Sequence, residues 1–205
     1  MKRKKMAENP KDKSREQSHK GRLFIVSAPS GAGKSTLCQA ARKQFPELVY
    51  SISFTTRAPR TGEKHGVDYF FISKAEFEKR IQQGDWAEWA NVHGHYYGTS
   101  ASFLNQQLSS GQRVLLDIDV QGARQILKQF PESVTIFIMP PALEVLRERL
   151  EKRGGDDPET IKKRLDAAEA EIAQKELYQH VIVNDRLDKA VAEFCDIISC
   201  HPPRS

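Results

Sequence analysis

The sequence of 205 residues lacks the long apolar run, about 18 residues, that a membrane-spanning helix needs. It also has few cysteines: Cys38, Cys195 and Cys200 form neither an even set nor a C-x-x-C pair, which excludes a disulfide framework and a cysteine metal site. Reduced, small cysteine side chains are typical of cytoplasmic proteins. We therefore expect a cytoplasmic protein that does not contact a membrane, with one well-buried core and an inserted lobe.

Most of the chain also lacks net charge. Residues 1–20 hold eight of the 32 Lys and Arg and three of the 27 Asp and Glu, which accounts for the whole formal charge of +5 and leaves 24 of each sign elsewhere. The basic run at residues 2–5 is followed by polar residues, which excludes a secretory signal and predicts a disordered basic tail. A solvated tail is the simpler interpretation, and contact of the tail alone with nucleic acid or another acidic surface is the alternative.

A glycine-rich segment lies between an apolar run at residues 23–26 and a helix-like pattern from residue 36. Strand, loop and helix in this order match the P-loop pattern G-x-x-x-x-G-K-[ST], whose backbone N–H groups bind nucleotide phosphates. Lys34 is expected to reach the β- and γ-phosphates, and Ser35 to hold Mg²⁺. The predicted phosphate-binding residues are Ala28, Pro29, Ser30, Gly31, Ala32, Gly33, Lys34, Ser35 and Thr36. Because Ala28 replaces the first glycine, Gly31 and Gly33 must carry the tight turn; an ordinary strand-to-helix turn is the alternative.

Apolar strands alternate with amphipathic helices after this loop, which predicts an α/β fold: a P-loop NTPase-type parallel sheet flanked by helices. Asp117 lies near the end of a buried strand, where a Walker-B aspartate that helps to hold Mg²⁺ belongs. The predicted boundaries are a tail at 1–20 and one domain at 21–205, with core segments 21–53, 100–153 and 178–200, an inserted lobe at 54–99 and a helical lid at 154–177.

The inserted lobe differs in pattern from its surroundings. Residues 54–68 have no periodicity, and a short predicted strand follows at residues 69–72. Ser73 and Glu76 form a capping box that opens a helix ending at Gly84. Two more predicted strands flank a turn at residues 94–95. The lobe is therefore expected to be antiparallel.

Arg57 and Arg60 lie three residues apart in the aperiodic loop, beside a proline. Arginine's planar fork binds phosphate oxygens bidentately, so two of them favour a clamp for a phosphate dianion, with ordinary surface charge as the alternative. Tyr69 and Tyr97 are hydroxyl donors that could complete this cage, and a core role is the alternative for both.

Three further arginines surround the glycines at residues 154–155. Arg149 and Arg153 are four apart on one predicted helix, a repulsive pair that nearby glutamates could offset locally. Arg164 approaches from the other side of the glycines, and together the three fit a lid that closes on a polyphosphate.

Four segments closely resemble guanylate kinases. They are the run Ser53-Phe-Thr-Thr-Arg-Ala-Pro-Arg-Thr-Gly-Glu63 and its continuation to Tyr69, Tyr96-Tyr-Gly-Thr99, Asp117-Ile-Asp-Val-Gln-Gly122, and Val181-Ile-Val-Asn-Asp185. The resemblance covers about residues 22–198. It implies transfer of the γ-phosphate of ATP to GMP, giving ADP and GDP, on a P-loop core with a GMP-binding lobe and a lid.

The resemblance also implies roles for individual residues. The implied GMP-binding residues are Ser53, Arg57, Arg60, Glu63, Tyr69, Glu88, Tyr97, Thr99 and Asp119, of which Glu88, Thr99 and Asp119 read guanine. Arg149, Arg153 and Asn184 match positions on the ATP side. The residues expected to act in catalysis are Lys34, Arg57, Arg149, Arg153 and Arg164, and the Mg²⁺ that accompanies ATP is assigned to Ser35 and Asp117.

A carboxylate pair suits guanine because guanine offers two donors, N1–H and the 2-amino group, where adenine presents an acceptor. A kinase for another nucleoside monophosphate is therefore disfavoured by Glu88 and Asp119. A non-catalytic guanylate-kinase-like interaction module is the other alternative, and the intact loop and lid argue against it. The oligomeric state, a homo-oligomer included, stays open.

Overall fold

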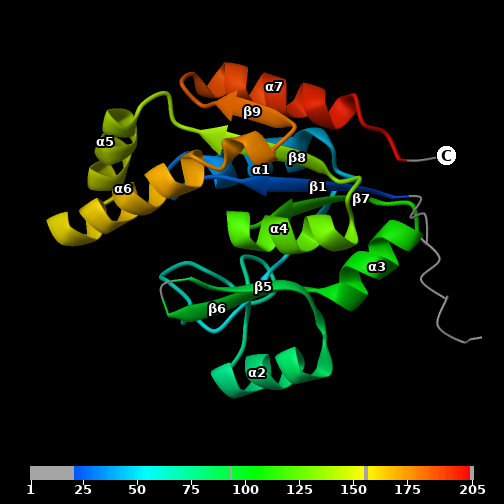
Figure 1. Cartoon of the computed structure of the whole chain (residues 1–205). Coiled ribbons are helices and arrows are strands. Elements are labelled where there is room, and N and C mark those ends of the chain that lie inside the picture. The colour runs from blue at the N-terminus through cyan, green and yellow to red at the C-terminus, as the bar shows by residue number, and fades with distance from the viewer. Residues whose placement is uncertain (1–20, 93, 155–156, 204–205) are drawn as a thin grey trace, which may run out of the picture.

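The computed structural model describes residues 21–92, 94–154 and 157–203, so the predicted tail lies outside the described residues (Figure 1). The core is a five-stranded parallel sheet with the order β2-β7-β1-β8-β9. Its strands are β1 (Arg22–Ser27), β2 (Val49–Ser51), β7 (Arg113–Asp117), β8 (Val134–Met139) and β9 (His180–Val183). Val26 near the end of β1 is level with Asp117 at the end of β7. The loop after β1 and this carboxylate therefore meet at one edge of the sheet, as the sequence predicted.

Helices cover both faces of this sheet because successive residues of β1 point to opposite sides. Phe24, fully buried, packs with α1 (Lys34–Gln44) and α7 (Leu187–Ser199) on one face. Ile25, also fully buried, packs with α3 (Ala101–Ser109) and α4 (Val120–Gln129) on the other. The described part of the chain thus has the predicted α/β core, and no helix within it is long and apolar enough to cross a membrane.

A second, four-stranded sheet lies below the core in Figure 1 and has the order β4-β3-β6-β5. Its strands are β3 (Phe54–Thr55), β4 (Phe70–Phe71), β5 (Trp86–Val92) and β6 (His95–Ser100), and α2 (Lys74–Gln83) covers it. Ser73 caps α2 by accepting the Glu76 N–H at 3.1 Å, and Gly84 ends it at φ 71°, as predicted. Phe77 of α2 stacks on Trp86, with ring centroids 4.3 Å apart.

The prediction of an antiparallel lobe is correct for β3–β6 and β5–β6 but wrong for β4, which runs parallel to β3. A parallel pair needs a long crossover connection, and the aperiodic loop between Thr55 and Phe70 supplies it. Strands of two residues carry too little pattern to reveal their direction.

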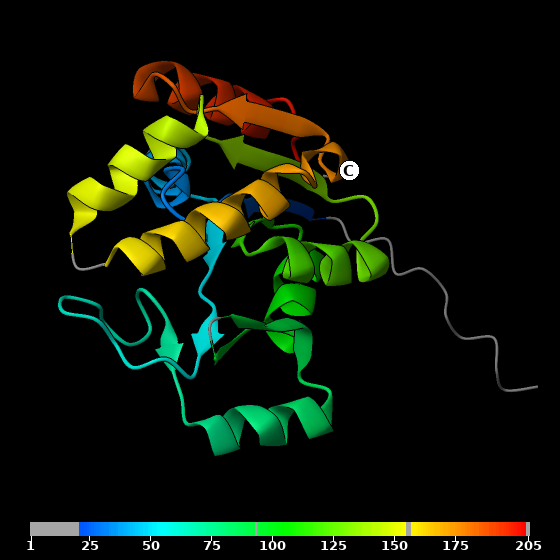
Figure 2. The ribbon, with the colours of Figure 1, turned by 60° about the vertical axis from the view of Figure 1, so that its left-hand side comes forward.

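Helices α5 (Leu143–Arg153) and α6 (Pro158–Ile172) form an antiparallel pair that projects from one side of the core (Figure 2). Leu146 and Leu150 of α5 are fully buried against Ile161 and Leu165 of α6. Asp157 caps α6 by accepting the Thr160 N–H at 2.7 Å, as predicted. A short 3₁₀ helix, η1 (Lys175–Leu177), leads back to β9. The boundaries of the lobe and the lid remain predictions.

Candidate active site

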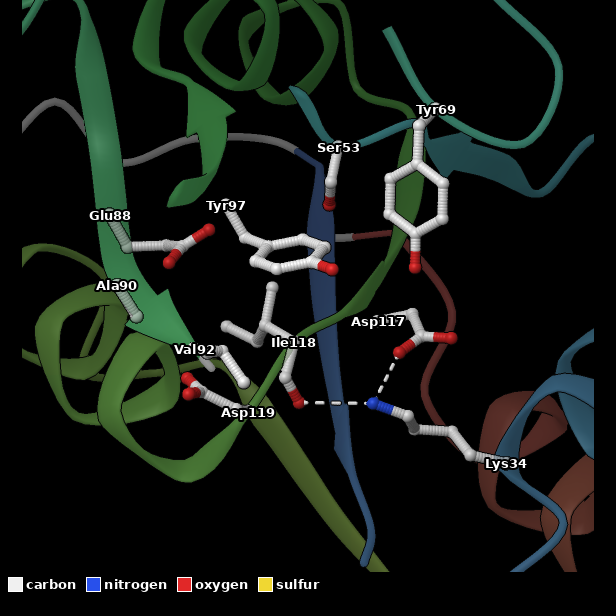
Figure 3. A pocket seen from close by; sticks show the side chains of 10 residues that line it. All are labelled: Lys34, Ser53, Tyr69, Glu88, Ala90, Val92, Tyr97, Asp117, Ile118 and Asp119. Carbon is white, nitrogen blue, oxygen red and sulfur yellow. Dashed lines mark hydrogen bonds and ion pairs between the residues drawn. The ribbon is translucent and has the colours of Figure 1, made fainter. Parts of the chain in front are cut away.

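A cavity of about 160 Å³ opens between the two sheets (Figure 3). The core sheet provides one wall and the lobe the other. The lining residues are Lys34, Ser53, Tyr69, Glu88, Ala90, Val92, Tyr97, Asp117, Ile118 and Asp119. Seven of these ten residues were predicted as site residues from the sequence, and they come from segments far apart in the chain. The cavity thus has a basic end at Lys34 and an acidic end at Glu88 and Asp119.

The glycine-rich loop turns as predicted, with Gly31 at φ 95° and Gly33 at φ 99°. Ala28 is buried in the core cluster beside α1. Gly33 is the N-cap of α1, and no side chain caps this helix end or places an acid in its first turn. Its first backbone N–H groups therefore face outward with the positive end of the helix dipole, an arrangement that suits phosphate oxygens.

Lys34 extends from this helix end into the cavity. Its Nζ lies 2.5 Å from Oδ1 of Asp117 and donates to the Ile118 carbonyl oxygen at 3.3 Å. Burial acts to lower the pKa of Lys34, but the attraction of the Asp117 carboxylate outweighs burial and raises the pKa above its ordinary value. Lys34 therefore stays charged. The Tyr50 hydroxyl donates to Asp117 at 3.4 Å, and no sequence motif predicted this contact.

Asn184, at the end of β9, is 5% exposed and holds the glycine-rich loop in place. Its side-chain amide donates to the Ala32 carbonyl oxygen at 2.8 Å. Its backbone carbonyl accepts from the Arg149 guanidinium at 2.8 Å. Asn184 therefore links the loop to α5, although the resemblance suggested only that it lies on the ATP side.

Arg149 and Arg164 are not among the described residues that line the cavity. Arg164 is half-buried on α6, and the side chain of Arg153 lies outside the described part of the structure. Ser35 is exposed at the start of α1. Among the described residues, no three His, Cys, Asp or Glu side chains converge to hold a metal ion. The predicted Mg²⁺ ligands Ser35 and Asp117 are hard oxygen donors, which fits an ion bound largely through phosphate oxygens and water.

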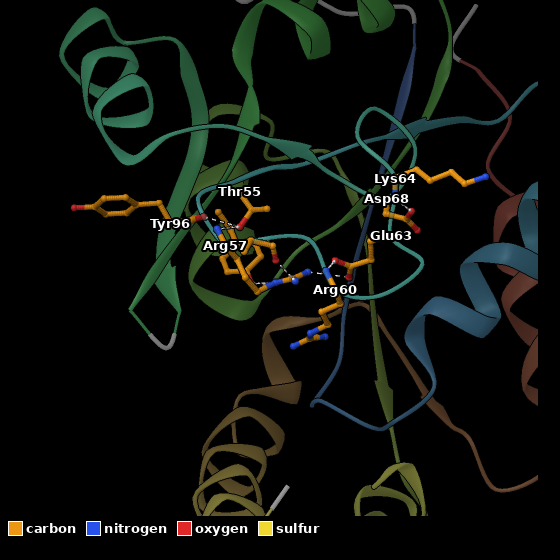
Figure 4. Close-up of polar contacts among 9 residues, drawn as sticks. Thr55, Arg57, Arg60, Glu63, Lys64, Asp68 and Tyr96 are labelled. Atoms are coloured by element: carbon orange, nitrogen blue, oxygen red, sulfur yellow. Dashed lines mark hydrogen bonds and ion pairs between the residues drawn. The ribbon is translucent and has the colours of Figure 1, made fainter. Parts of the chain in front are cut away.

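Arg57 does not line the cavity but is the centre of a polar network in the lobe, in contact with the cavity residue Tyr97 (Figure 4). Its guanidinium donates to Glu63 at 2.9 Å, to the Tyr97 hydroxyl at 3.1 Å and to the Ala58 carbonyl oxygen at 2.7 Å. The hydrogen bond from Arg57 lowers the pKa of Glu63, and Glu63 in turn raises that of Arg57. Glu63 also accepts the Arg60 N–H at 2.8 Å, while the Arg60 side chain is exposed.

The two tyrosines predicted for the cage do lie together. Tyr69 and Tyr97 pack edge to face with centroids 5.9 Å apart, and the Arg57 guanidinium carbon lies 5.5 Å from the centre of the Tyr69 ring. In Figure 3 the Tyr69 hydroxyl points toward Asp117. Burial raises the pKa of this hydroxyl, so Tyr69 remains a donor at neutral pH. Ser53 lines the cavity beside them.

Glu88 forms the acidic end of the cavity. It is 3% exposed, and its Oε1 accepts a hydrogen bond from the Thr99 hydroxyl at 2.6 Å. Burial raises the pKa of Glu88 to about 7, the Thr99 bond opposes the shift, and the nearby Asp119 adds to it. Without a ligand, this carboxylate carries its charge only partly at neutral pH.

Asp119 is held at the start of α4, where its Oδ1 accepts the Gly122 N–H at 2.8 Å. This capping role was not predicted, although Asp is a favoured N-cap residue. Gly122 is also the point where α4 and Glu88 meet. A Cβ placed there would lie 2.5 Å from Glu88 Oε2 and 3.3 Å from Asp119 Oδ1. The absence of a side chain at Gly122 thus allows both carboxylates to face the same space.

Comparison with known proteins gives one family. The sequence model of the guanylate kinase family matches residues 20–201. A guanylate kinase of Carboxydothermus hydrogenoformans is 51% identical over 84% of this chain and 85% of its own length, and one of Geobacter sulfurreducens is 49% identical over 87% and 88%. The crystal structure of guanylate kinase from Anaplasma phagocytophilum superposes with a TM-score of 0.71 at 34% identity, covering 88% of this chain and 85% of that one.

Proposed function

Because the chain belongs to the guanylate kinase family, and is therefore a kinase that transfers a phosphoryl group from ATP to GMP, we propose that the cavity between its sheets is the GMP site. The guanine lies at the acidic end, against Glu88 and Asp119, and the phosphate lies beside Tyr69 and Tyr97, which Arg57 contacts from outside the lining. The observation that carries this orientation is a buried carboxylate, Glu88, paired with the Thr99 hydroxyl at 2.6 Å.

A buried carboxylate favours guanine over adenine through its hydrogen-bonding edge. Guanine N1–H and the 2-amino group both donate, and the oxygens of Glu88 and Asp119 accept. Adenine would bring an acceptor against an acceptor, which leaves buried groups unsatisfied at a cost of about 1–3 kcal/mol each. Thr99 keeps one Glu88 oxygen, Oε1, in place, and Gly122 leaves room for the other, Oε2.

The GMP phosphate is bound by the lobe. Arg57 is already oriented by Glu63 and Tyr97, so little side-chain entropy is lost when it binds an oxyanion. Arg60, exposed beside it, supplies a second guanidinium. The hydroxyls of Tyr69, Tyr97 and Ser53 are further donors that complete the cage and direct the attacking phosphate oxygen toward Lys34.

The ATP phosphates are bound at the N-terminus of α1. The uncapped N–H groups after Gly33 donate hydrogen bonds to the phosphate oxygens. Lys34, at the same helix end, places its charge beside the β- and γ-phosphates. Ser35 and Asp117 would hold Mg²⁺, which would supply positive charge against the phosphates. Arg149, Arg153 and Arg164 act from α5 and α6 on the phosphoryl group in transfer, and residues 154–177 serve as the lid that excludes water. Asn184 holds the phosphate-binding loop in place through its hydrogen bond to the Ala32 carbonyl oxygen.

The intact glycine-rich loop and the Lys34–Asp117 pair favour a catalyst over a non-catalytic interaction module. We place the protein in the cytoplasm, since ATP and GMP are its substrates and Cys38, Cys195 and Cys200 are free thiols. The basic tail remains a solvated extension in this proposal, and nucleic acid is not a partner of the charge-balanced domain.

A nucleotide panel tests the site. ADP release is measured with GMP, IMP and AMP for the parent and for Glu88→Gln, which turns one acceptor oxygen into a donor. We expect kcat/KM for GMP to fall at least about tenfold, while KM for ATP stays within about twofold, because a charge-assisted hydrogen bond is lost. IMP lacks the 2-amino group, so the GMP-to-IMP preference should narrow. Glu193→Gln, an exposed change on α7, is the matched control. If neither the GMP value nor the ratio moves by twofold, the guanine does not lie at Glu88.

A further inference from the structure

Strand β5 carries Glu88 on an irregular stretch of backbone. In the pairing with β6, Trp86 lies opposite Ser100 and Glu88 opposite Thr99, so Ala87 is an extra residue, a β-bulge. Trp86, Ala87 and Glu88 are all buried in succession, which regular alternation along a strand does not give. The bulge re-aims one side chain, and here that side chain is Glu88.

The other edge of β5 faces a helix. β5 is the last strand of the lobe sheet, and α4 of the core lies along its free edge. The Gln125 side chain hydrogen-bonds both backbone groups of Trp89. Its Nε2 donates to the Trp89 carbonyl oxygen at 2.8 Å, and its Oε1 accepts from the Trp89 N–H at 3.2 Å. One helical turn later, Gln129 donates to the Ala87 carbonyl at 2.6 Å. The two amides therefore hold the backbone on both sides of Glu88.

We infer that Gln125 and Gln129 form an amide clamp that positions Glu88 and thereby sets the selectivity for GMP. This inference rests on the proposed role of Glu88. The same helix carries Asp119 at its N-cap and Gly122 against Glu88 Oε2, so α4 controls both acidic groups at once. The clamp joins the lobe strand to this core helix and fixes the spacing between two carboxylates, Glu88 on β5 and Asp119 at the N-cap of α4.

Neither glutamine lines the cavity, so both act through β5 as positioning residues. A bulged edge strand has fewer ladder hydrogen bonds than a regular one, which gives Glu88 freedom to shift when the clamp is lost. Donors aimed at a carboxylate tolerate only small displacements. The clamp should therefore appear in GMP recognition and not in ATP binding or in the phosphoryl-transfer step.

The test replaces each glutamine with methionine, which keeps the length and helix propensity but removes the amide. For Gln125→Met we expect KM for GMP to rise about three- to tenfold and the GMP-to-IMP ratio to narrow, with kcat and KM for ATP within about twofold. Gln129→Met, with one bond to lose, should do the same to a smaller extent. Gln106→Met, an exposed glutamine on α3, is the control. If a variant melts at a lower temperature but keeps the parent's ratio of kcat/KM for GMP to that for IMP, the two glutamines only stabilise the fold. That result would overturn the inference.

A double-mutant cycle separates the clamp from the site it serves. If Gln125 acts through Glu88, Gln125→Met should have little further effect on KM for GMP in the Glu88→Gln background, so the two changes are strongly non-additive. Additive effects would overturn the clamp while leaving Glu88 in its role. If Glu88→Gln itself leaves kcat and KM for GMP unchanged, the result overturns both the proposed guanine site and the clamp.

Discussion

The two ends of the cavity handle charge in opposite ways. At the phosphate end, Lys34 and Arg57 each already have an acidic partner, Asp117 and Glu63, at 2.5 and 2.9 Å. At the base end, Glu88 is 3% exposed, has a neutral hydroxyl as its partner and lies near a second carboxylate. One end is electrostatically satisfied before substrate arrives, and the other is not.

This difference follows from what each end must bind. Phosphate groups are strongly charged, and cations that are already held in place by acids gain affinity by being preorganised. Guanine is neutral, so selectivity must come from desolvated hydrogen bonds, whose value depends on exclusion of water. The base end therefore stores an unfavourable charge that only the right ligand relieves.

Removal of a positive charge at the phosphate end should cause the largest loss of activity. We expect Lys34→Ala to lower kcat by about a thousandfold or more, because the lysine acts where charge develops during transfer. The fold should survive, since the Lys34 side chain ends at the cavity and not in the core. Steady-state kinetics with circular dichroism as a folding control check this. Near-normal turnover in a folded variant would remove Lys34 from the catalytic site.

A side chain added at Gly122, next to Glu88, should weaken the binding of GMP and leave the binding of ATP unchanged. Gly122→Ala places a Cβ 2.5 Å from Glu88 Oε2, so the carboxylate must shift. We expect KM for GMP to rise at least about tenfold and KM for ATP to stay within about twofold. Alanine favours a helix over glycine by about 1 kcal/mol, so lost stability of α4 is not the expected cause. An unchanged KM for GMP would show that Glu88 can move without loss of binding.

The buried charge of Glu88 should make the stability of the folded protein depend on pH. The pKa of Glu88 is about 7 in the folded protein against 4.5 for an ordinary glutamate, so the group destabilises the fold progressively as pH rises from about 4.5 to 7. Above pH 7 the cost is on the order of 3 kcal/mol. Glu88→Gln should therefore melt about 5 °C or more above the parent at pH 8, with the gain disappearing near pH 4.5. A gain that does not depend on pH would mean that the Glu88 charge is not its source.

The smallest effect is expected from the tail. Deletion of residues 1–20 removes the whole net charge but no assigned residue, so kcat and KM for both substrates should change by less than about twofold at physiological salt. A large fall in kcat/KM for GMP would connect the tail to the active site. A nucleic-acid contact that disappears with the tail would give the tail a separate role.

Sequence patterns revealed most of the phosphate end and less of the base end. The turn at Gly31 and Gly33 and the position of Asp117 at the end of a buried strand follow from local motifs. The ion pair between Lys34 and Asp117 was not predicted. Glu88 and Asp119 entered through family resemblance alone. Contacts between distant segments have no local signal, so the link from Asn184 to Ala32 and the grip of Gln125 on Trp89 were missed. The parallel pairing of β4 was missed because its strands are two residues long.

The glutamines of α4 have one more consequence, for self-association. A strand at the edge of a sheet exposes N–H and C=O groups that can pair with a strand of another molecule, and many proteins block such pairing with lysine, proline or a bulge. Here the Ala87 carbonyl is already bonded to Gln129, and both backbone groups of Trp89 are bonded to Gln125. The bulge at Ala87 adds a second obstacle on the same strand. These positions of β5 are thereby blocked for the strand addition that leads to aggregates.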